Sequence, residues 1–386
     1  MFEKVNAGHP DKMADRLAGA VVDLVYERAG GLTKANPRVA CEVMAGHGRV
    51  DVQIETSLGR MDLRAEDIDP LIRRLFGERV VGNVLIAPQD AHLSENQTRG
   101  LRCGDNGIFR GCPPTEEQRV LTAIAATIYG SIPYDGKYII NSHHPKVRLS
   151  DLPEYDIIQK KRERHRNIND ELFEIESKHA ESMKPFNKKE QKRWDKLIAE
   201  AQYIYKYIKA KCKEAEELAE SQWEHDITIC QSHLADDEQS GIVDLIRNGY
   251  QLDGDLTINP LGPWTGGIDV DCGCTNRKLG SDMGDGVSGG GINGKDLSKG
   301  DVSINIACFI LAQRYGTPIE ACCSIGDEQV TFNGYYCAEA FSKGLERLPI
   351  TMSFRDVVEM ARLYILTDCG GSFERFAEWG LIRPRI

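Results

Sequence analysis

The chain has 386 residues, a formal net charge of −11 at pH 7 and an apolar fraction of 41%. The length predicts two or three domains, and the acidic balance argues against a surface that binds nucleic acid or an anionic membrane. The sequence has no apolar run of about 20 residues, so no membrane span is expected. The start of the chain lacks the layout of a signal peptide, which predicts a cytoplasmic protein whose 12 cysteines are reduced.

Residues 11–28 have apolar side chains at helical spacing, which predicts an amphipathic helix that ends at Gly30. Pro10 suits the first position of this helix. Asp11 would then lie at the helix entry, where backbone N–H groups have no partner within the helix. The patterns that follow predict four strands and one helix. The strands are expected at 38–44, 50–56, 81–87 and 137–140, and the helix at 116–129.

Residues 151–225 differ from the rest of the chain, because nearly half of them are charged and none is glycine. In the second half of this segment, apolar residues recur at heptad-like spacing from Trp194 to Ala219. Asn187 followed by Glu190 resembles a capping box at a helix start. We therefore expect a helical hairpin, which could meet another subunit or a foreign protein. The composition leaves open a solvated, partly disordered insert.

The last third of the chain again alternates between predicted strands and helices. Strands are expected at 226–230, 256–259 and 319–325, and helices at 302–314 and 354–366. Twelve glycines lie between residues 262 and 300, and composition alone would make this segment a flexible surface loop. The regular long crossovers of a purely parallel sheet are missing, so the pattern predicts an α+β or two-layer α/β fold.

Two charged patches punctuated by glycine lie far apart in the sequence, at residues 8–12 and 269–301. Their cationic or cation-capable side chains are those of His9, Lys12, Arg277, Lys278, Lys295 and Lys299. Their interleaved carboxylates are those of Asp11, Asp271, Asp296 and Asp301. Lys and Arg suit phosphate oxygens, and Asp suits Mg²⁺. The mixture predicts a site for a polyphosphate and a metal, although His9 alone could be a structural helix cap.

Two other features have competing interpretations. The run from Gly289 to Lys295 approaches a P-loop, but Asp296 stands where that loop needs Ser or Thr to hold Mg²⁺. Glu42 and Glu55 fall in predicted strands, where a glutamate that points into a sheet is rarely left unpaired. They are candidate cation ligands or partners of buried lysines, and the alternative is a position that faces solvent.

Taken in order, the motifs resemble those of S-adenosylmethionine synthetases (methionine adenosyltransferases). The resemblance covers residues 1–150 and 226–386. It starts with Gly-His-Pro-Asp-Lys at 8–12 and the spacing between Glu42 and Glu55. The further motifs lie at 104–107, 133–137, 258–262, 266–267, 271–278, 289–291 and 294–301.

The resemblance implies three similar intertwined domains, each of a β-sheet with helices, at residues 1–100, 101–250 and 251–386, with the hairpin of 151–225 inserted in the middle one. It also implies a reaction in which the sulfur of L-methionine attacks C5′ of ATP and displaces triphosphate, which is then hydrolysed to diphosphate and phosphate. Two Mg²⁺ ions and one K⁺ per site are implied. The assembly would be a homodimer with active sites between subunits, or a tetramer.

The family's roles carry over to matching positions of this sequence. His9 would lie at the oxygen of the breaking bond, and the cations around the triphosphate would be Arg277, Lys295, Lys299, Lys278 and Lys137. Mg²⁺ would be held by Asp11 and Asp301, and K⁺ by Glu42. The carboxylates that orient methionine and adenosine would be Asp105, Asp135 and Asp271. Methionine would contact Glu55 and Gln89, and adenine would contact Trp264 and Ile325.

Several features depart from the family pattern. The insert replaces a short stretch of the middle domain, and the segment from Gln89 to Asp105 is shorter than the usual gating loop. These changes affect loop motion and subunit packing more than the charged positions. Two other functions compete: a non-catalytic relative that binds nucleotide or regulates a partner, and another Mg²⁺-dependent polyphosphate hydrolase.

Overall fold

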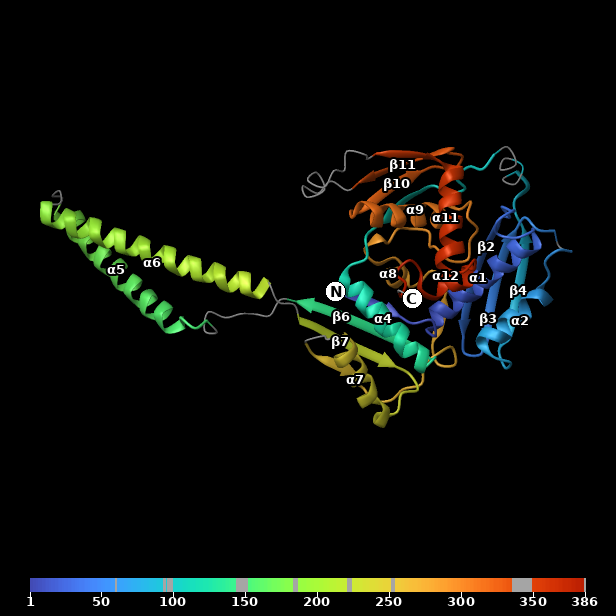
Figure 1. The fold of residues 1–386 in the computed structure, drawn as a ribbon, viewed down its shortest axis with the longest axis horizontal. Coiled ribbons are helices and arrows are strands. Elements are labelled where there is room, and N and C mark those ends of the chain that lie inside the picture. The colour runs from blue at the N-terminus through green and yellow to red at the C-terminus, as the bar shows by residue number, and fades with distance from the viewer. Residues whose placement is uncertain are drawn as a thin grey trace. The chain divides into compact units, whose positions relative to one another are not determined.

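A computed structural model describes residues 1–59, 61–92, 95, 100–143, 152–182, 187–220, 224–250, 254–334 and 349–384. The chain divides into two compact units (Figure 1). The first, here called the body, comprises Met1–Asn141 and Asp226–Ile386, and the second, the hairpin unit, comprises Ser142–His225. The predicted boundaries at residues 100 and 250 stay a prediction. In the described part of the chain, no helix combines the length and the apolar character needed to cross a membrane.

The body contains three sheets of four strands each, and every sheet combines segments from distant parts of the chain. The first has the order β1-β6-β7-β8, with β1 at Phe2–Val5, β6 at Gly136–His143, β7 at Glu224–Gln231 and β8 at Leu256–Ile258. The second has the order β4-β3-β2-β9, with β4 at Val81–Pro88, β3 at Arg49–Thr56, β2 at Val39–Gly46 and β9 at Cys272–Cys274. The third has the order β12-β11-β10-β5, with β12 at Ile350–Ser353, β11 at Gln329–Gly334, β10 at Ile319–Cys323 and β5 at Gly107–Gly111.

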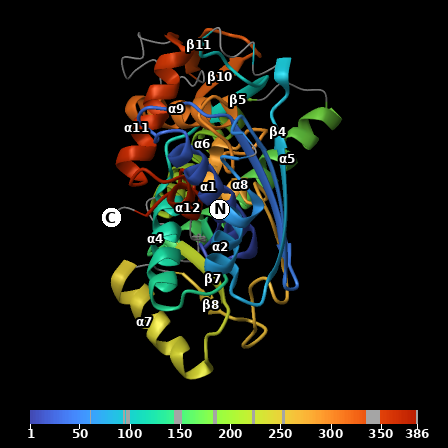
Figure 2. The same ribbon diagram turned by 90° about the vertical axis from the view of Figure 1, so that its right-hand side faces the viewer.

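Helices pack against each of these sheets. They are α1 (Pro10–Arg28), α2 (Ala65–Phe76), α4 (Glu116–Ser131), α7 (Gln239–Tyr250), α8 (Leu279–Met283), α9 (Gly300–Tyr315), α11 (Phe354–Asp368) and α12 (Phe373–Trp379). Helix α1 contacts β2 and β9, α4 contacts β1, and α9 contacts β5 and β10. Helix α1 also lies beside α12, which comes from the other end of the chain (Figure 2). The α+β prediction is confirmed, with mixed sheets of both parallel and antiparallel pairs.

Strand β2 shows why one face of its sheet meets helices. Successive side chains of a strand point to opposite faces. Cys41 and Val43 are buried in the core with residues of α1, while Glu42 and Met44 between and beyond them are exposed. The alternation therefore leaves the other face of this sheet with charged and apolar side chains exposed.

The hairpin unit consists of α5 (Tyr155–Ser182) and α6 (Lys188–Glu220). The predicted capping box is present, since Asn187 Oδ1 accepts the N–H of Glu190 at 3.0 Å and Glu190 Oε2 accepts the N–H of Asn187 at 2.9 Å. The helices are antiparallel, because Lys211 pairs with Glu154 near one end and Arg193 with Glu171 near the other.

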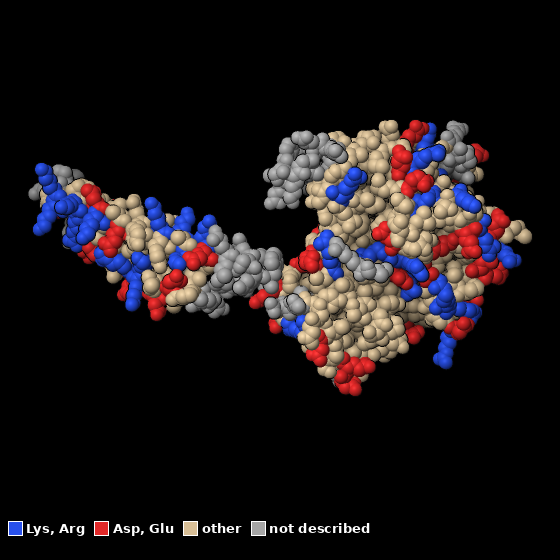
Figure 3. Space-filling model, in the orientation of Figure 1, with Lys and Arg blue, Asp and Glu red and all other residues tan. Residues whose placement is uncertain are grey.

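The apolar interface of the hairpin forms two small clusters of its own. Ile168, Leu197 and Ile204 make one of them, and the buried members of both clusters come from residues 152–215. The predicted helical hairpin is thus confirmed, and the disordered alternative is wrong for the described residues. Lys, Arg, Asp and Glu are intermixed on its visible surface (Figure 3). The unit therefore has the mixed charge that the sequence indicated.

Candidate active site

His9 caps the N-terminus of α1 and is 2% exposed. Its Nδ1 accepts the backbone N–H of Asp11 at 3.1 Å, so the proton of a neutral imidazole lies on Nε2. Burial, followed by the positive charges of Lys137 and Lys278, lowers the pKa of His9 to about 3. The structural interpretation of His9 as a helix cap is correct. The same geometry gives the site a neutral imidazole with one N–H donor to spare.

Asp11 joins the start of α1 to the turn that follows β9. Its Oδ1 accepts the N–H of Cys274 at 2.8 Å and lies 2.8 Å from Arg277 Nε. The close approach requires Gly273, because a Cβ there would lie 2.1 Å from the carbonyl oxygen of Pro10. Two motifs separated by more than half of the chain thus meet at one carboxylate.

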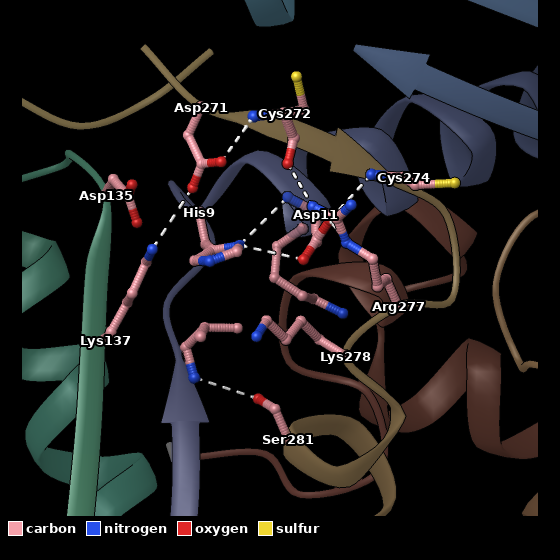
Figure 4. Close-up of polar contacts among 12 residues, drawn as sticks. His9, Asp11, Asp135, Lys137, Asp271, Cys272, Cys274, Arg277, Lys278 and Ser281 are labelled. Atoms are coloured by element: carbon pink, nitrogen blue, oxygen red, sulfur yellow. Dashed lines mark hydrogen bonds and ion pairs between the residues drawn. The ribbon is translucent and has the colours of Figure 1, made fainter. Parts of the chain in front are cut away.

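Lys137 approaches His9 from β6, on the opposite side from Arg277 and Lys278 (Figure 4). Lys137 Nζ is 3.4 Å from Asp271 Oδ2 and 5.7 Å from the centre of the Trp264 ring. Lys278 Nζ is 3.4 Å from Glu3 Oε1. Three cationic side chains therefore flank a neutral imidazole, and an anion could lie between them.

Asp135 supplies a buried carboxylate to the same region. It is 2% exposed, and its Oδ2 accepts the N–H of Gly267 at 3.1 Å. Its Oδ1 accepts no hydrogen bond from the described residues. Burial raises the pKa of Asp135, while the bond from Gly267 opposes the rise. An unsatisfied buried oxygen is costly, so this atom suits a donor on a bound molecule. These residues form what we call the histidine cluster: His9, Asp11, Asp135, Lys137, Trp264, Asp271, Arg277 and Lys278.

A second group, the lysine cluster, consists of Asp105, Lys295, Lys299 and Asp301. Lys295 Nζ donates to Asp301 Oδ2 at 2.7 Å, and Lys299 Nζ lies 3.5 Å from Asp105 Oδ1. Burial raises the pKa of Asp301, and the ammonium of Lys295 opposes that rise. Asp105 Oδ2 is buried and accepts no hydrogen bond from the described residues. A second carboxylate with an unsatisfied oxygen beside Asp301 fits a hard cation such as Mg²⁺.

The two clusters differ in the charged groups that surround them. The charged groups that shift the pKa of His9 and Asp135 belong to the histidine cluster, and those that shift the pKa of Asp301 belong to the lysine cluster. Among the residues that the structure describes, no ion pair joins one cluster to the other.

The other predicted site residues are not members of either cluster. Glu42 Oε2 accepts the hydroxyl of Thr275 on the exposed face of β2. Glu55 is exposed at the end of β3, and the next residue, Thr56, accepts the N–H of Gln89 at 2.9 Å, so Glu55 and Gln89 share one edge. Ile325 is exposed, and its N–H donates to Asn106, the neighbour of Asp105.

Two charges counted in the sequence patches are structural. Lys12 is fully buried, with its ammonium bonded to Asp15 and Asp282. The Asp296 carboxylate accepts the N–H groups of Val39 at 2.9 Å and Ser298 at 2.8 Å. Residue type and position could not separate these charges from those of the two clusters. Asp15 and Asp282, which pair with Lys12, were missed, although the spacing from Lys12 to Asp15 fits a pair on one helix face.

Comparisons with known proteins bear on the family and on the fold. No family model matches the chain. The S-adenosylmethionine synthase of Jannaschia sp. is 30% identical over 141 residues, 31% of this chain and 34% of that protein. The S-adenosylmethionine synthase of Sulfurovum sp. is 24% identical over 332 residues, 81% of this chain and 72% of that protein. The first relatives are thus matched over about a third of their length.

The fold is similar to that of an unusual S-adenosylmethionine synthetase from Campylobacter jejuni. The TM-score is 0.60 at 17% identity, with 98% of this chain and 93% of that chain covered. At this identity the likeness shows the fold alone. In sequence and in fold, the chain is thus similar to S-adenosylmethionine synthetases, from which it has diverged.

Proposed function

We propose that this protein makes S-adenosylmethionine from ATP and L-methionine, with release of diphosphate and phosphate. The observation that carries the proposal is His9, a buried neutral imidazole flanked by Lys137, Arg277 and Lys278. Displacement at C5′ of ATP expels a triphosphate with about four negative charges, so catalysis depends on electrostatic stabilisation and positioning. The cluster offers donors and cations for such a leaving group.

His9 would act through Nε2, because Asp11 occupies Nδ1. The Nε2–H donates to the oxygen that bridges C5′ and the triphosphate, where negative charge grows as the bond breaks. Asp135 and Asp271 would accept hydrogen bonds from the adenosine hydroxyls or the methionine ammonium. Oδ1 of Asp135, which accepts no hydrogen bond from the described residues, could take one from such a donor. Trp264 offers a ring face to adenine.

Each cluster supplies a carboxylate for a metal ion, while the described residues hold no group of three or more metal-ligating side chains. Asp11 and Asp301 would hold Mg²⁺, with Asp105 Oδ2 as a further oxygen beside Asp301. Glu42 on the exposed face of β2 would contribute to a K⁺ site. When bound, Mg²⁺ neutralises charge on the phosphate oxygens.

A homodimer would bring the histidine cluster of one chain to the lysine cluster of its partner. The exposed sheet faces of the body carry large apolar side chains, which suits an interface. They include Met44, Leu85, Ile108 and Ile139.

A mixing experiment checks the shared site. We expect His9→Ala and Lys295→Met proteins to be inactive alone and to regain activity when mixed and allowed to exchange subunits. Each mixed dimer then has one intact site, so random exchange predicts about a quarter of wild-type activity. Mixtures that stay inactive after exchange, verified by mass, would place both clusters in one chain's site.

The reaction itself is tested with ATP, L-methionine, Mg²⁺ and K⁺, with S-adenosylmethionine detected by mass spectrometry. We expect product only when methionine is present. Asp301→Asn should raise the Mg²⁺ concentration needed for half-maximal rate. If the folded protein forms no product that depends on methionine, the proposed activity of this protein is wrong.

Trp264 provides an optical test of nucleotide binding. A non-hydrolysable ATP analogue is expected to change the intrinsic fluorescence, because stacking alters the environment of the indole. The change should disappear in Trp264→Phe, which keeps a ring face for adenine. If the analogue binds Trp264→Phe with the wild-type signal, Trp264 does not contact the base.

The hairpin unit is expected to be dispensable for the chemistry. Its apolar clusters contain no residue of the body core, so a short Gly-Ser linker in place of residues 155–222 should leave the body folded. Light scattering and the methionine-dependent assay on the same deletion should show retained turnover with an altered oligomer size or partner capture. Loss of all activity, with fold and oligomer unchanged, would make the hairpin part of the active site.

A further inference from the structure

Five residues next to the two clusters form a closed ring of hydrogen bonds. They come from α1, α8 and the turns on either side of α8, and they are Lys12, Asp15, Asn276, Asn293 and Asp282. Lys12, Asp15 and Asp282 are fully buried, and Asn293 is 2% exposed. A ring with charged members in such surroundings rigidifies the segments that it joins, since breaking one bond leaves a buried group unpaired.

The charged side of the ring is built on Lys12. Its Nζ donates to Asp15 Oδ2 at 3.0 Å and to the two oxygens of Asp282 at 2.6 and 2.7 Å. Asp15 Oδ1 then accepts the backbone N–H of Asn276 at 2.7 Å, and Asp282 Oδ2 accepts Nδ2 of Asn293 at 3.1 Å. One ammonium thus anchors two turns that lie on either side of α8.

The ring closes through the side-chain amide of Asn276. Its Oδ1 accepts the backbone N–H of Asn293 at 2.9 Å, and its Nδ2 donates to the backbone C=O of Asn293 at 3.1 Å. Asn276 has a φ of 60°, a conformation that Asn tolerates better than most residues. Gly291 must be glycine here, because a Cβ would lie 2.3 Å from the Asn276 side chain. The amide therefore pairs with the glycine-rich segment as a backbone strand would.

This pairing fixes the turn that carries Arg277 and Lys278 against the glycine-rich segment. Arg277 and Lys278 directly follow Asn276 in the chain. Lys295 follows Asn293 by two residues, and its Nζ also bonds the C=O of Gly290 in the paired segment. Without the amide, the segment from 289 to 294 would keep fewer bonds to the turn that carries Arg277.

We propose that Asn276 is a positioning residue for triphosphate binding: its amide holds the turn that carries Arg277 and Lys278 against the glycine-rich segment of the same chain. The inference rests on the proposed function, because the triphosphate is the leaving group of that reaction. Asn276 itself need not touch the ligand.

The variant Asn276→Gly tests the proposal with little backbone strain, because glycine adopts positive φ freely. It removes the amide and leaves the N–H that Asp15 accepts. The matched control is His47→Gly, which makes the same kind of change at an exposed turn residue with a φ of 50°. The probe is inorganic triphosphate with Mg²⁺, and its dissociation constant is measured by calorimetry on the full chain.

For Asn276→Gly we expect the dissociation constant to rise by about tenfold, the loss of two neutral hydrogen bonds. The KM for ATP should rise with it, while the KM for methionine stays within about twofold. His47→Gly should match the wild type in all three. Asn276→Asp retains one acceptor and should fall between the wild type and the glycine variant.

A glycine variant that melts earlier but binds triphosphate as the wild type does would make Asn276 merely structural and overturn the proposal. If that variant does not fold, wild-type affinity in Asn276→Asp overturns it equally. A wild-type protein that binds triphosphate but makes no S-adenosylmethionine would contradict the proposed function, and the affinities would still decide the role of Asn276. Absence of triphosphate binding by the wild type would overturn both.

Discussion

Replacing His9 by alanine is expected to lower the turnover number for S-adenosylmethionine by about two to four decades, the range for loss of one preorganised donor in the transition state. The donor is preorganised because Asp11 fixes the ring through Nδ1, and the burial of His9 leaves it little freedom to turn. The measurement is the steady-state rate with saturating ATP and methionine. His165→Ala in the hairpin unit, a residue that belongs to neither cluster, serves as the matched control and should retain the wild-type rate.

The protonation state of His9 adds a pH test. Burial and the nearby lysines lower its pKa to about 3, so the ring gains a proton only as the pH falls toward that value. The rate should therefore show no limb from His9 near the ordinary histidine pKa of about 6.5. A limb there that disappears in His9→Gln would mean that the cations do not hold the ring neutral.

Replacing Lys295 by methionine is expected to have a similar effect on kcat/KM for ATP, by about two to four decades. Methionine keeps the length of the lysine side chain up to Cε, but the ammonium that pairs with Asp301 at 2.7 Å is lost. Triphosphate would lose a cation, and Asp301 would keep a buried carboxylate without its partner. The measurement is kcat/KM for ATP at saturating methionine.

The matched control for Lys295→Met is Lys206→Met, the same change on the exposed surface of α6. It should leave kcat/KM for ATP unchanged. If Lys295→Met also turns over ATP at the wild-type rate, the lysine cluster has no part in the reaction, and the site would have to be complete within the histidine cluster.

Elements with a strong local pattern could be predicted from the sequence. The strands expected at 38–44 and 50–56 are β2 and β3, because their alternation and the intervening Gly-His-Gly turn are local signals. The helix expected at 11–28 is α1, and the heptad stripe is α6. In each case the residues that determine the element are its own.

Short strands were missed, because their partners lie far away in the chain. Phe2–Val5 becomes β1 only by pairing with β6, and Cys272–Cys274 becomes β9 only by pairing with β2. A strand of only three or four residues is too short to show a clear alternation of apolar and polar side chains. Such strands form because tertiary pairing overrides local preference.

The glycine-rich segment shows the same limit at the site. Its composition suggested a flexible surface loop, but residues 291–294 are buried, and Asn293 is bonded through its backbone and side chain. The motif order predicted that His9, Asp11 and Arg277 act together, and the structure brings them into contact. It could not predict that Lys12, one residue away, faces the core, since charge alone does not give the direction of a side chain.

The most direct measurement of the central claim is the product balance of the purified protein with ATP, L-methionine, Mg²⁺ and K⁺. Each S-adenosylmethionine formed should be accompanied by one diphosphate and one phosphate. Omission of methionine should abolish the formation of S-adenosylmethionine. His9→Ala run in parallel should lose all three together. Phosphate release that does not depend on methionine, with no S-adenosylmethionine formed by well-folded wild-type protein, would contradict the account and point to a polyphosphate hydrolase.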